Sequence, residues 1–257
     1  MIRVDKFGVG PPLVLLHGWA MHGGLFAPLV RELAQQRTLH VVDLPGHGGS
    51  GWEEDDPFTL RACAAAIASR VPPAPWLGWS LGGLVALRAA LDGTREITGA
   101  IALAASARFT RAEDWTDAVD DSVLASFAAG LVSDHRGTLQ RFLALEALGS
   151  DHLRDELRFL QQQIADRPAP HPRVLYAGLE ILRNTDLRDE LSSLAIPSLW
   201  IGGRRDRLAP WRAIAASAAL APDATHFCIA NAGHAPFLRC AEEVARGVGA
   251  WLGQYDL

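Results

Sequence analysis

The sequence predicts an α/β protein with a mostly parallel central sheet, helices on both faces of the sheet and a helical insert. Two observations lead to this fold class. Short apolar runs of strand length alternate with stretches of helical periodicity over most of the 257 residues. Between residues 107 and 190 the alternation stops, and only helical periodicity remains, interrupted by Gly137, Gly149 and Pro168-Ala169-Pro170.

Six apolar runs are bounded by turn residues, as Gly18 and Pro45-Gly46 bound the first two, and five stretches between them show helical periodicity. The expected strands are Leu13–His17, Thr38–Leu44, Pro75–Trp79, Ile97–Ala104, Pro197–Gly202 and Ala224–Ala230. The expected helices are residues 24–36, 59–70, 81–92, 211–220 and 239–252.

The helical stretch at residues 107–190 falls between the fourth and fifth expected strands. Ligands of open α/β sheets bind outside the carboxyl ends of the strands. We therefore expect residues 107–190 to form a helical lid over that edge. Residues 1–106 and 191–257 are expected to form the core into which this lid is inserted.

Composition and charge narrow the class of protein. The formal net charge is −5, from 24 basic and 29 acidic residues, whereas nucleic-acid binding favours a surplus of Lys and Arg. The longest apolar stretches are too short to span a membrane, and residues 1–6 lack the apolar segment of a signal peptide. The three cysteines, Cys63, Cys228 and Cys240, lack metal-ligand spacing. We expect a monomeric cytoplasmic protein with no metal and no cofactor.

One motif carries a specific chemistry. Gly78-Trp79-Ser80-Leu81-Gly82-Gly83 matches the G-x-S-x-G pattern, with an apolar strand before it and the helical residues 84–90 after it. This context is typical of the nucleophile elbow of the α/β-hydrolase fold, a strained turn that lifts a serine hydroxyl clear of the sheet. A side chain at position 78 or 82 would collide with neighbouring backbone. The sequence therefore predicts Ser80 as the nucleophile of a serine hydrolase.

A serine hydroxyl needs a base, and the base needs an orienting acid; in this fold the acid and then the histidine follow the serine along the chain. Asp206 lies in the loop directly after the fifth expected strand, and His234 lies among small residues after the sixth. Asp186 and Asp189 are nearby loop acids, but they precede a strand instead of following one. Of nine histidines, His234 alone combines the expected order with a loop after a strand.

The transition state of ester hydrolysis carries an oxyanion that needs two backbone N–H donors. One is expected from Leu81, the residue after the nucleophile. The other is expected from Trp19, in the loop after the first buried strand, and the Trp19 ring is expected to wall the acyl pocket. A plain core position for the Trp19 ring is the alternative.

Several segments together resemble the pimeloyl-[acyl-carrier protein] methyl ester esterases of biotin synthesis. In the core they are His17-Gly18-Trp19, the run from Val42 to Gly48, the run from Trp76 to Ala86, and Ala232-Gly233-His234-Ala235-Pro236-Phe237. In the lid they are Arg141-Phe142-Leu143-Ala144-Leu145-Glu146, the run from Gly178 to Leu182, and the run from Thr185 to Arg188. Many hydrolases share the core segments, so the lid segments carry the specificity.

The resemblance implies a carboxylesterase that removes the methyl group from pimeloyl methyl ester carried on acyl carrier protein, through an acyl-enzyme. It also implies a substrate channel formed by Trp19, Ser80, Leu81, Phe142, Leu143, Ala144, Leu145, Glu146 and His234. Glu146 stands where the family can carry a neutral amide.

In that family, lid arginines dock the acidic carrier protein, and Arg141, Arg154 and Arg158 fall at matching positions. Where a further arginine is expected, this chain has Gly137 with Arg136 beside it. Arg154 and Arg158 are i,i+4 neighbours on one helical face. A salt-bridged, solvated surface would show a similar pattern, because acids are as frequent as arginines between residues 134 and 173.

Other functions share parts of this pattern. A general short-chain carboxylesterase or a cofactor-free perhydrolase can present Gly-Trp-Ser-x-Gly-Gly, and a thioesterase would cut the link to the carrier instead. A non-catalytic ligand-binding protein on a hydrolase scaffold often lacks one member of the triad, whereas Ser80, Asp206 and His234 are all present here.

Overall fold

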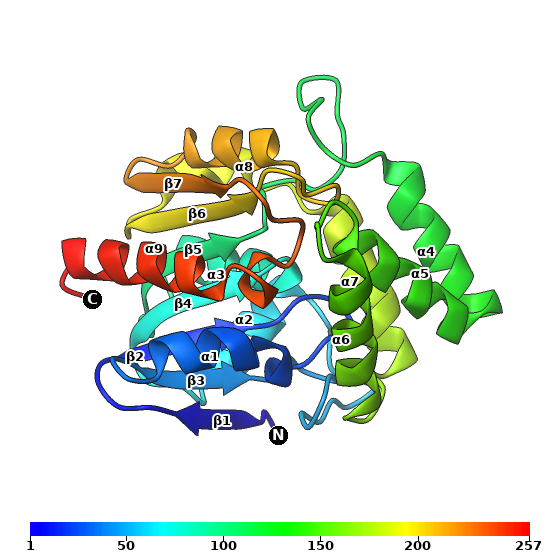
Figure 1. The fold of residues 1–257 in the computed structure, drawn as a ribbon, viewed down its shortest axis with the longest axis horizontal. Coiled ribbons are helices and arrows are strands. Elements are labelled where there is room, and N and C mark those ends of the chain that lie inside the picture. Colours follow the sequence, from blue (N-terminus) through cyan, green and yellow to red (C-terminus); the bar gives the residue numbers. More distant parts are fainter.

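The computed structural model describes all 257 residues and contains one seven-stranded sheet in the order β1-β3-β2-β4-β5-β6-β7 (Figure 1). Six strands are parallel, and β1 pairs antiparallel with β3. The strands are β1 (Val4–Phe7), β2 (Pro12–Leu16), β3 (Thr38–Val42), β4 (Ala74–Trp79), β5 (Ile97–Leu103), β6 (Ser198–Gly203) and β7 (Ala224–Ile229).

The predicted α/β-hydrolase fold is confirmed, and all six expected strands are present. Strand β1 was missed. It is a short edge strand of sequence VDKF whose residues are half-buried or exposed, so it lacks the apolar run that marks the buried strands. By contrast, all six residues of the central strand β4 are buried, which is why its sequence is almost entirely apolar.

The five helices expected outside the insert are present, with ends shifted by a few residues. The helix expected at residues 24–36 begins as the 3-10 helix η1 and continues as α1. Figure 1 shows α1 and α9 together on one face of the sheet, with α2 and α3 on the other. These elements are η1 (Gly23–Phe26), α1 (Ala27–Leu33), α2 (Leu60–Ala68), α3 (Leu81–Leu91), α8 (Trp211–Ala218), the 3-10 helix η3 (Pro236–Leu238) and α9 (Ala241–Gln254).

Four helices lie between β5 and β6 in the chain, and Figure 1 shows them gathered beyond the carboxyl ends of the strands. Residues 107–120 precede them as a loop closed by isolated bridges, and the 3-10 helix η2 (Arg188–Ser193) crosses the expected boundary at residue 190. The division into a core and a lid at residues 107 and 190 stays a prediction. The helices are α4 (Asp121–Ser133), α5 (His135–Ala147), α6 (Leu153–Ala165) and α7 (Pro172–Asn184).

One continuous hydrophobic core joins the sheet, its covering helices and the inner side of the insert. Because buried residues of α5 and α7 belong to this core, the insert and the sheet with its covering helices share one hydrophobic core. Cys63 is buried in the core, and burial raises the pKa of its thiol to about 12. No helix is both long enough and apolar enough to cross a bilayer.

Candidate active site

Ser80 occupies the turn between β4 and α3, with a positive φ of 54° and ψ of −117°. A non-glycine residue in this conformation is strained, and the surrounding contacts hold it there. The Ser80 N–H donates to the carbonyl of Leu103 at 2.9 Å, and the Ser80 carbonyl accepts from Gly83 at 2.9 Å. The turn therefore fixes Ser80 at the amino end of α3, where the helix dipole favours developing negative charge.

Close backbone approach explains the two glycines of the motif. A Cβ at Gly78 would lie 2.1 Å from the carbonyl oxygen of Gly82, and a Cβ at Gly82 would lie 2.4 Å from that of Leu16. Neither backbone atom can move without displacing a strand or the start of α3. The structure thus gives the reason for the G-x-S-x-G spacing.

The three predicted triad residues, which come from three separate loops, meet in one hydrogen-bonded chain. His234 Nε2 lies 3.0 Å from Ser80 Oγ, and His234 Nδ1 lies 2.8 Å from Asp206 Oδ2. The other carboxylate oxygen of Asp206 accepts from the N–H groups of Leu208 and Ala209, at 2.8 and 2.9 Å. All three side chains are buried. The arrangement can pass a proton from the serine to the imidazole while Asp206 holds the ring.

The rival acids lie elsewhere. Asp186 is held by Arg108 and Arg188, at 2.8 Å to each guanidinium, and its hydrogen bonds to these arginines lower the pKa of its carboxyl. Asp189 is exposed in η2. Neither acid is within hydrogen-bond distance of His234.

The predicted oxyanion donors lie where β2 and β4 end. We call residues 17–22, which join β2 to η1, the oxyanion loop. The backbone N–H groups of Trp19 and Leu81 make no hydrogen bond within the protein, so both are free to donate. A Cβ at Gly18 would lie 3.2 Å from the Cβ of Ser80, which shows how closely this loop approaches the serine.

The lid covers this loop with helices α5 and α7. The ring of Phe142 meets that of Trp19 edge-on, with centroids 4.5 Å apart, and the Trp19 indole N–H donates to the carbonyl of Leu175 at 2.8 Å. Trp19 is fully buried by these contacts. Its ring therefore lies at the interface between the core and the insert, near the position of an acyl group attached to Ser80.

The five residues of the segment Phe142–Glu146 differ in how deeply they are buried. Phe142, Leu143 and Glu146 are buried, Leu145 is half-buried, and Ala144 lies on the exposed face of α5. Helical periodicity explains the difference, because residues i, i+1 and i+4 share a face that i+2 does not. The structure thus brings three of the five expected channel residues fully to the inner side of the lid.

Glu146 is a fully buried carboxyl group for which neither oxygen has a hydrogen-bond partner. Burial, together with the nearby Asp206 carboxylate, raises the pKa of Glu146 well above its usual range. The same surroundings therefore favour the neutral, protonated form of this side chain. A protonated carboxyl can both donate and accept hydrogen bonds, as can the amide that the family can carry at this position.

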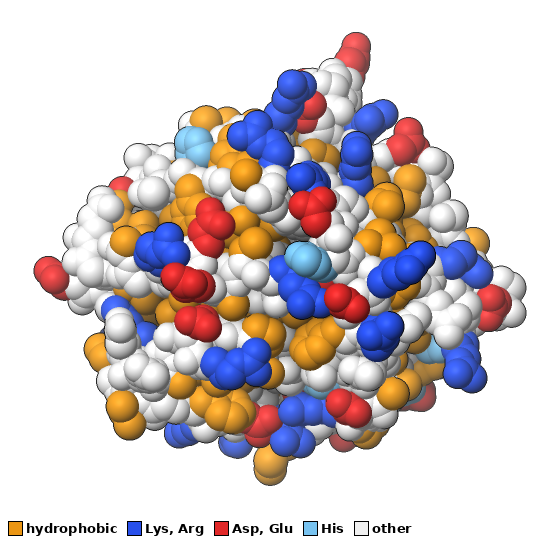
Figure 2. Space-filling model, viewed as in Figure 1, with side chains coloured by type: hydrophobic (Ala, Val, Ile, Leu, Met, Phe, Trp, Pro, Cys, Tyr) orange, Lys and Arg blue, Asp and Glu red, His pale blue; other side chains and the backbone are white.

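The three lid arginines singled out from the sequence are all exposed. Arg141 contacts Asp134 at 3.3 Å, Arg158 contacts Asp155 at 3.6 Å, and Arg154 has no ion pair. On the face drawn in Figure 2, basic and acidic side chains are interspersed. The arginines are accessible to a partner, and the two that are paired are in weak surface ion pairs.

Trp79 supports the catalytic histidine, a role that was not predicted from the sequence. Its buried indole N–H donates to the carbonyl oxygen of His234 at 2.7 Å, and its ring lies 5.6 Å from the imidazole. The only sequence signal was its place between Gly78 and Ser80 in the motif. Gly178 was also missed as a contact: a Cβ there would lie 2.6 Å from the Trp19 ring.

The fold and the site define a serine hydrolase of the α/β-hydrolase class. In agreement, residues 11–239 match the alpha/beta hydrolase fold family. The chain is 53% identical to the pimeloyl-[acyl-carrier protein] methyl ester esterase of Stenotrophomonas maltophilia over 95% of this chain and 93% of that protein. It is 51% identical to the same esterase of Xanthomonas oryzae pv. oryzae, over 96% and 97%. The chain belongs to this esterase family.

Solved structures agree on the fold. An esterase from Exiguobacterium antarcticum superposes with a TM-score of 0.88 at 20% identity, covering 98% of this chain and 95% of that one. A thermophilic esterase from Thermogutta terrifontis gives a TM-score of 0.82 at 23% identity, covering 98% and 93%.

Proposed function

We propose that this chain hydrolyses the methyl ester of a pimeloyl group carried on acyl carrier protein, with Ser80, His234 and Asp206 as the catalytic triad. The observation that carries the proposal is the buried Ser80–His234–Asp206 hydrogen-bond chain in a protein about half identical to esterases of that name. The similarity covers both the core and the lid, since it spans 95% of this chain.

In the first half of the reaction, Ser80 Oγ attacks the carbonyl carbon of the methyl ester while its proton passes to His234 Nε2. The negative charge that develops on the carbonyl oxygen is accepted by the N–H groups of Trp19 and Leu81. Collapse of this intermediate breaks the bond to the methoxy group, which takes the proton from His234 and leaves as methanol. Asp206 stabilises the imidazolium between these two proton transfers.

In the second half, a water molecule gives a proton to His234 and attacks the acyl-enzyme at the same carbonyl carbon. The oxyanion again lies on the two backbone N–H groups. Breakdown returns the proton to Ser80 Oγ and frees the carboxylic acid at the distal end of the pimeloyl chain, which loses its remaining proton to solvent and becomes the carboxylate. No group beyond the triad and the two backbone donors is needed for the proton balance.

In this proposal, the lid selects the substrate. The buried face of α5 lines the acyl chain through Phe142, Leu143 and Glu146, with the Trp19 ring against Phe142. The exposed arginines Arg141, Arg154 and Arg158 would bind the acidic carrier protein. Charge-assisted hydrogen bonds from guanidinium groups to carboxylates or to the carrier's phosphate suit this role.

The test compares three substrates: pimeloyl-carrier methyl ester, free pimelate methyl ester and p-nitrophenyl acetate. We expect kcat/KM to be highest for the carrier ester. Arg154→Glu and Arg158→Glu should lower it by about tenfold each, which corresponds to about 1.4 kcal/mol of lost docking, and should leave the small esters unaffected.

Two controls make the result decisive. Ser80→Ala should abolish both hydrolysis and labelling by a fluorophosphonate. Arg246→Glu, an exposed change on α9 far along the chain from the lid, should not affect carrier-ester activity. Equal kcat/KM for carrier and small esters would indicate a general short-chain carboxylesterase or perhydrolase, and an unlabelled native protein would indicate a non-catalytic scaffold.

A further inference from the structure

The oxyanion loop is held in a conformation that it would not adopt unaided. Ala20 has a positive φ of 63°, a left-handed conformation that costs an L-residue with a Cβ about 1 kcal/mol or more. The loop contains no helix or strand of its own, and the Trp19 N–H makes no hydrogen bond within the protein that would hold it. Side-chain hydrogen bonds, some made within the loop and some to segments outside it, must therefore keep this N–H in place.

The first contact is made by His17, at the start of the loop. Its Nδ1 lies 2.8 Å from the carbonyl oxygen of Gly18, and its Nε2 accepts from the N–H of Leu44 at 2.9 Å. Because Nε2 accepts, Nδ1 carries the proton and donates. The Gly18 carbonyl and the Trp19 N–H belong to the same planar peptide, so this hydrogen bond fixes the direction of that N–H.

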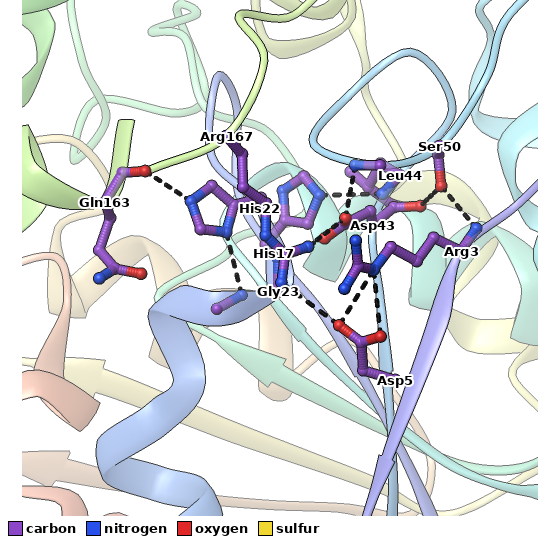
Figure 3. Close-up of polar contacts among 12 residues, drawn as sticks. Arg3, Asp5, His17, His22, Gly23, Asp43, Leu44, Ser50, Gln163 and Arg167 are labelled. Carbon is purple, nitrogen blue, oxygen red and sulfur yellow. Dashed lines mark hydrogen bonds and ion pairs between the residues drawn. The ribbon is translucent and has the colours of Figure 1, made fainter. Parts of the chain in front are cut away.

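The second contact holds the far end of the loop through Asp43, just after β3. One carboxylate oxygen of Asp43 accepts from the N–H of Gly23 at 2.7 Å. The other accepts from the N–H of Gly49 at 2.8 Å and from the guanidinium of Arg167. Figure 3 shows Asp43 between Gly23 of the core and Arg167 of the insert.

Arg167 follows α6 and reaches into the core. Besides Asp43, it contacts Asp5 of β1 at 3.3 Å, and Asp5 in turn pairs with Arg3 at 3.0 Å. The Asp43 side chain is almost completely buried and that of Arg167 largely so. A charge pair screened from water in this way is stronger and more rigid than a surface pair.

A second lid contact acts on the loop directly. His22 Nε2 lies 2.6 Å from the carbonyl oxygen of Gln163, in the last turns of α6, and His22 Nδ1 accepts from the N–H of Gly24. The segment 163–167 of the insert therefore touches the loop at His22 and, through Asp43, contacts Gly23, the residue that follows the loop (Figure 3).

We propose that Arg167 and Asp43 are positioning residues: by seating the insert against Asp43, Arg167 holds the oxyanion loop so that the Trp19 N–H faces Ser80. Arg167 touches no reacting atom and acts through Asp43 and Gly23. The insert therefore helps to form the oxyanion site and also covers it. Full catalytic power is reached only when segment 163–167 is seated, whichever ester is bound.

This inference rests on the proposed function, since it assumes an oxyanion at Ser80. The experiment measures kcat and KM for p-nitrophenyl acetate, a substrate without a carrier, in wild type, Arg167→Met and Arg167→Lys. Misplacing one oxyanion donor should lower kcat about tenfold in Arg167→Met and leave KM within about twofold. Arg167→Lys keeps the charge next to Asp43 and should recover most of the loss.

A matched control is Arg173→Met, which removes an exposed arginine of α7 that pairs with Glu54 and does not touch the loop. It should leave kcat unchanged. A second readout is binding of phenylboronic acid, which forms a tetrahedral adduct with Ser80. Its inhibition constant should rise in Arg167→Met by the same factor as kcat falls, a correlation that mere loosening of the insert would not produce.

If Arg167→Met does not fold, Arg167→Gln, which keeps an N–H donor toward Asp43, should give a smaller loss of kcat with the same unchanged KM. An unchanged kcat in Arg167→Met, or equal losses in Arg167→Met and Arg173→Met, would overturn the inference while the hydrolase activity of the wild type stands. A wild type that neither hydrolyses the ester nor reacts with a fluorophosphonate would instead overturn the proposed function.

Discussion

The indole N–H of Trp19 donates a hydrogen bond of 2.8 Å to the carbonyl oxygen of Leu175, and so connects the oxyanion loop to helix α7 of the insert. Both residues are fully buried. Since a buried hydrogen bond of this kind contributes about 0.5–1.5 kcal/mol net, it is one of the contacts that decide how tightly the lid covers Ser80.

Trp19→Phe tests this contact. The ring is kept in large part and the backbone N–H is unchanged, so the oxyanion donor remains. We expect the free energy of unfolding, measured in urea, to fall by about 1–2 kcal/mol, because the Leu175 carbonyl loses a partner and a small void forms. Trp115→Phe, at a half-buried indole in the loop before α4, serves as the control. A loss in kcat as large as that of Arg167→Met would contradict the separation of the two roles.

The strained turn at Ser80 leads to a prediction about stability. Glycine adopts a positive φ without a Cβ penalty, so Ser80→Gly should be more stable than Ser80→Ala by about 1 kcal/mol. Both variants lack the hydroxyl and should be inactive. Thermal unfolding of the two variants under the same conditions provides the measurement; equal melting temperatures would show that the turn is not strained.

Gly178 of α7 leads to a prediction about the fit of the lid. A Cβ there would lie 2.6 Å from the Trp19 ring and 3.5 Å from a methyl group of Leu81. Gly178→Ala should therefore push α7 away from the site and lower kcat/KM, although alanine favours a helix by about 1 kcal/mol over glycine.

Gly249→Ala is the matched control for that change. Gly249 lies within α9, and a Cβ there has no neighbour within 4 Å. This variant should gain up to about 1 kcal/mol in stability and keep full activity. If Gly178→Ala behaves like Gly249→Ala, the close fit between α7 and Trp19 has no functional role.

The burial of Glu146 leads to a prediction about how the stability of the protein depends on pH. Burial raises the pKa of this carboxyl in the folded protein, so between the unfolded and the folded pKa the native state holds a proton that the unfolded chain has released. The stability that depends on this proton is complete below the unfolded pKa, which is about 4.3, and is lost as the pH rises toward the folded pKa.

Glu146→Gln removes the titration and keeps the shape of the side chain. The free energy of unfolding of the variant should exceed that of the wild type by an amount that grows between pH 5 and 8, by at most about 1.4 kcal/mol per pH unit. Glu242→Gln, on the exposed side of α9, should show no such trend. Parallel pH dependence of the wild type and Glu146→Gln would mean that Glu146 is ionised in the folded state.

Much of the fold was predictable because the signals are local. A buried parallel strand needs a continuous apolar run, and β2, β4 and β5 each have one. Strand β1 has none, because an edge strand pairs on one side only and here carries Asp5 and Lys6. The orientation of Ala144 was missed for a related reason: a resemblance over a segment does not say which side of a helix faces the site.

The residue pattern along the chain was enough to predict the elements, the elbow at Ser80 and the order in which an acid and a histidine follow it. These depend on near neighbours in the chain, through apolar spacing and the glycines of one turn. Other features became visible only in the folded arrangement: the hydrogen bond between Asp206 and His234, the burial of Glu146 without a partner, and the contact of Arg167 with Asp43, 124 positions earlier in the chain. Such contacts arise when loops from different strands are brought to the same edge of the sheet, and no local pattern encodes them.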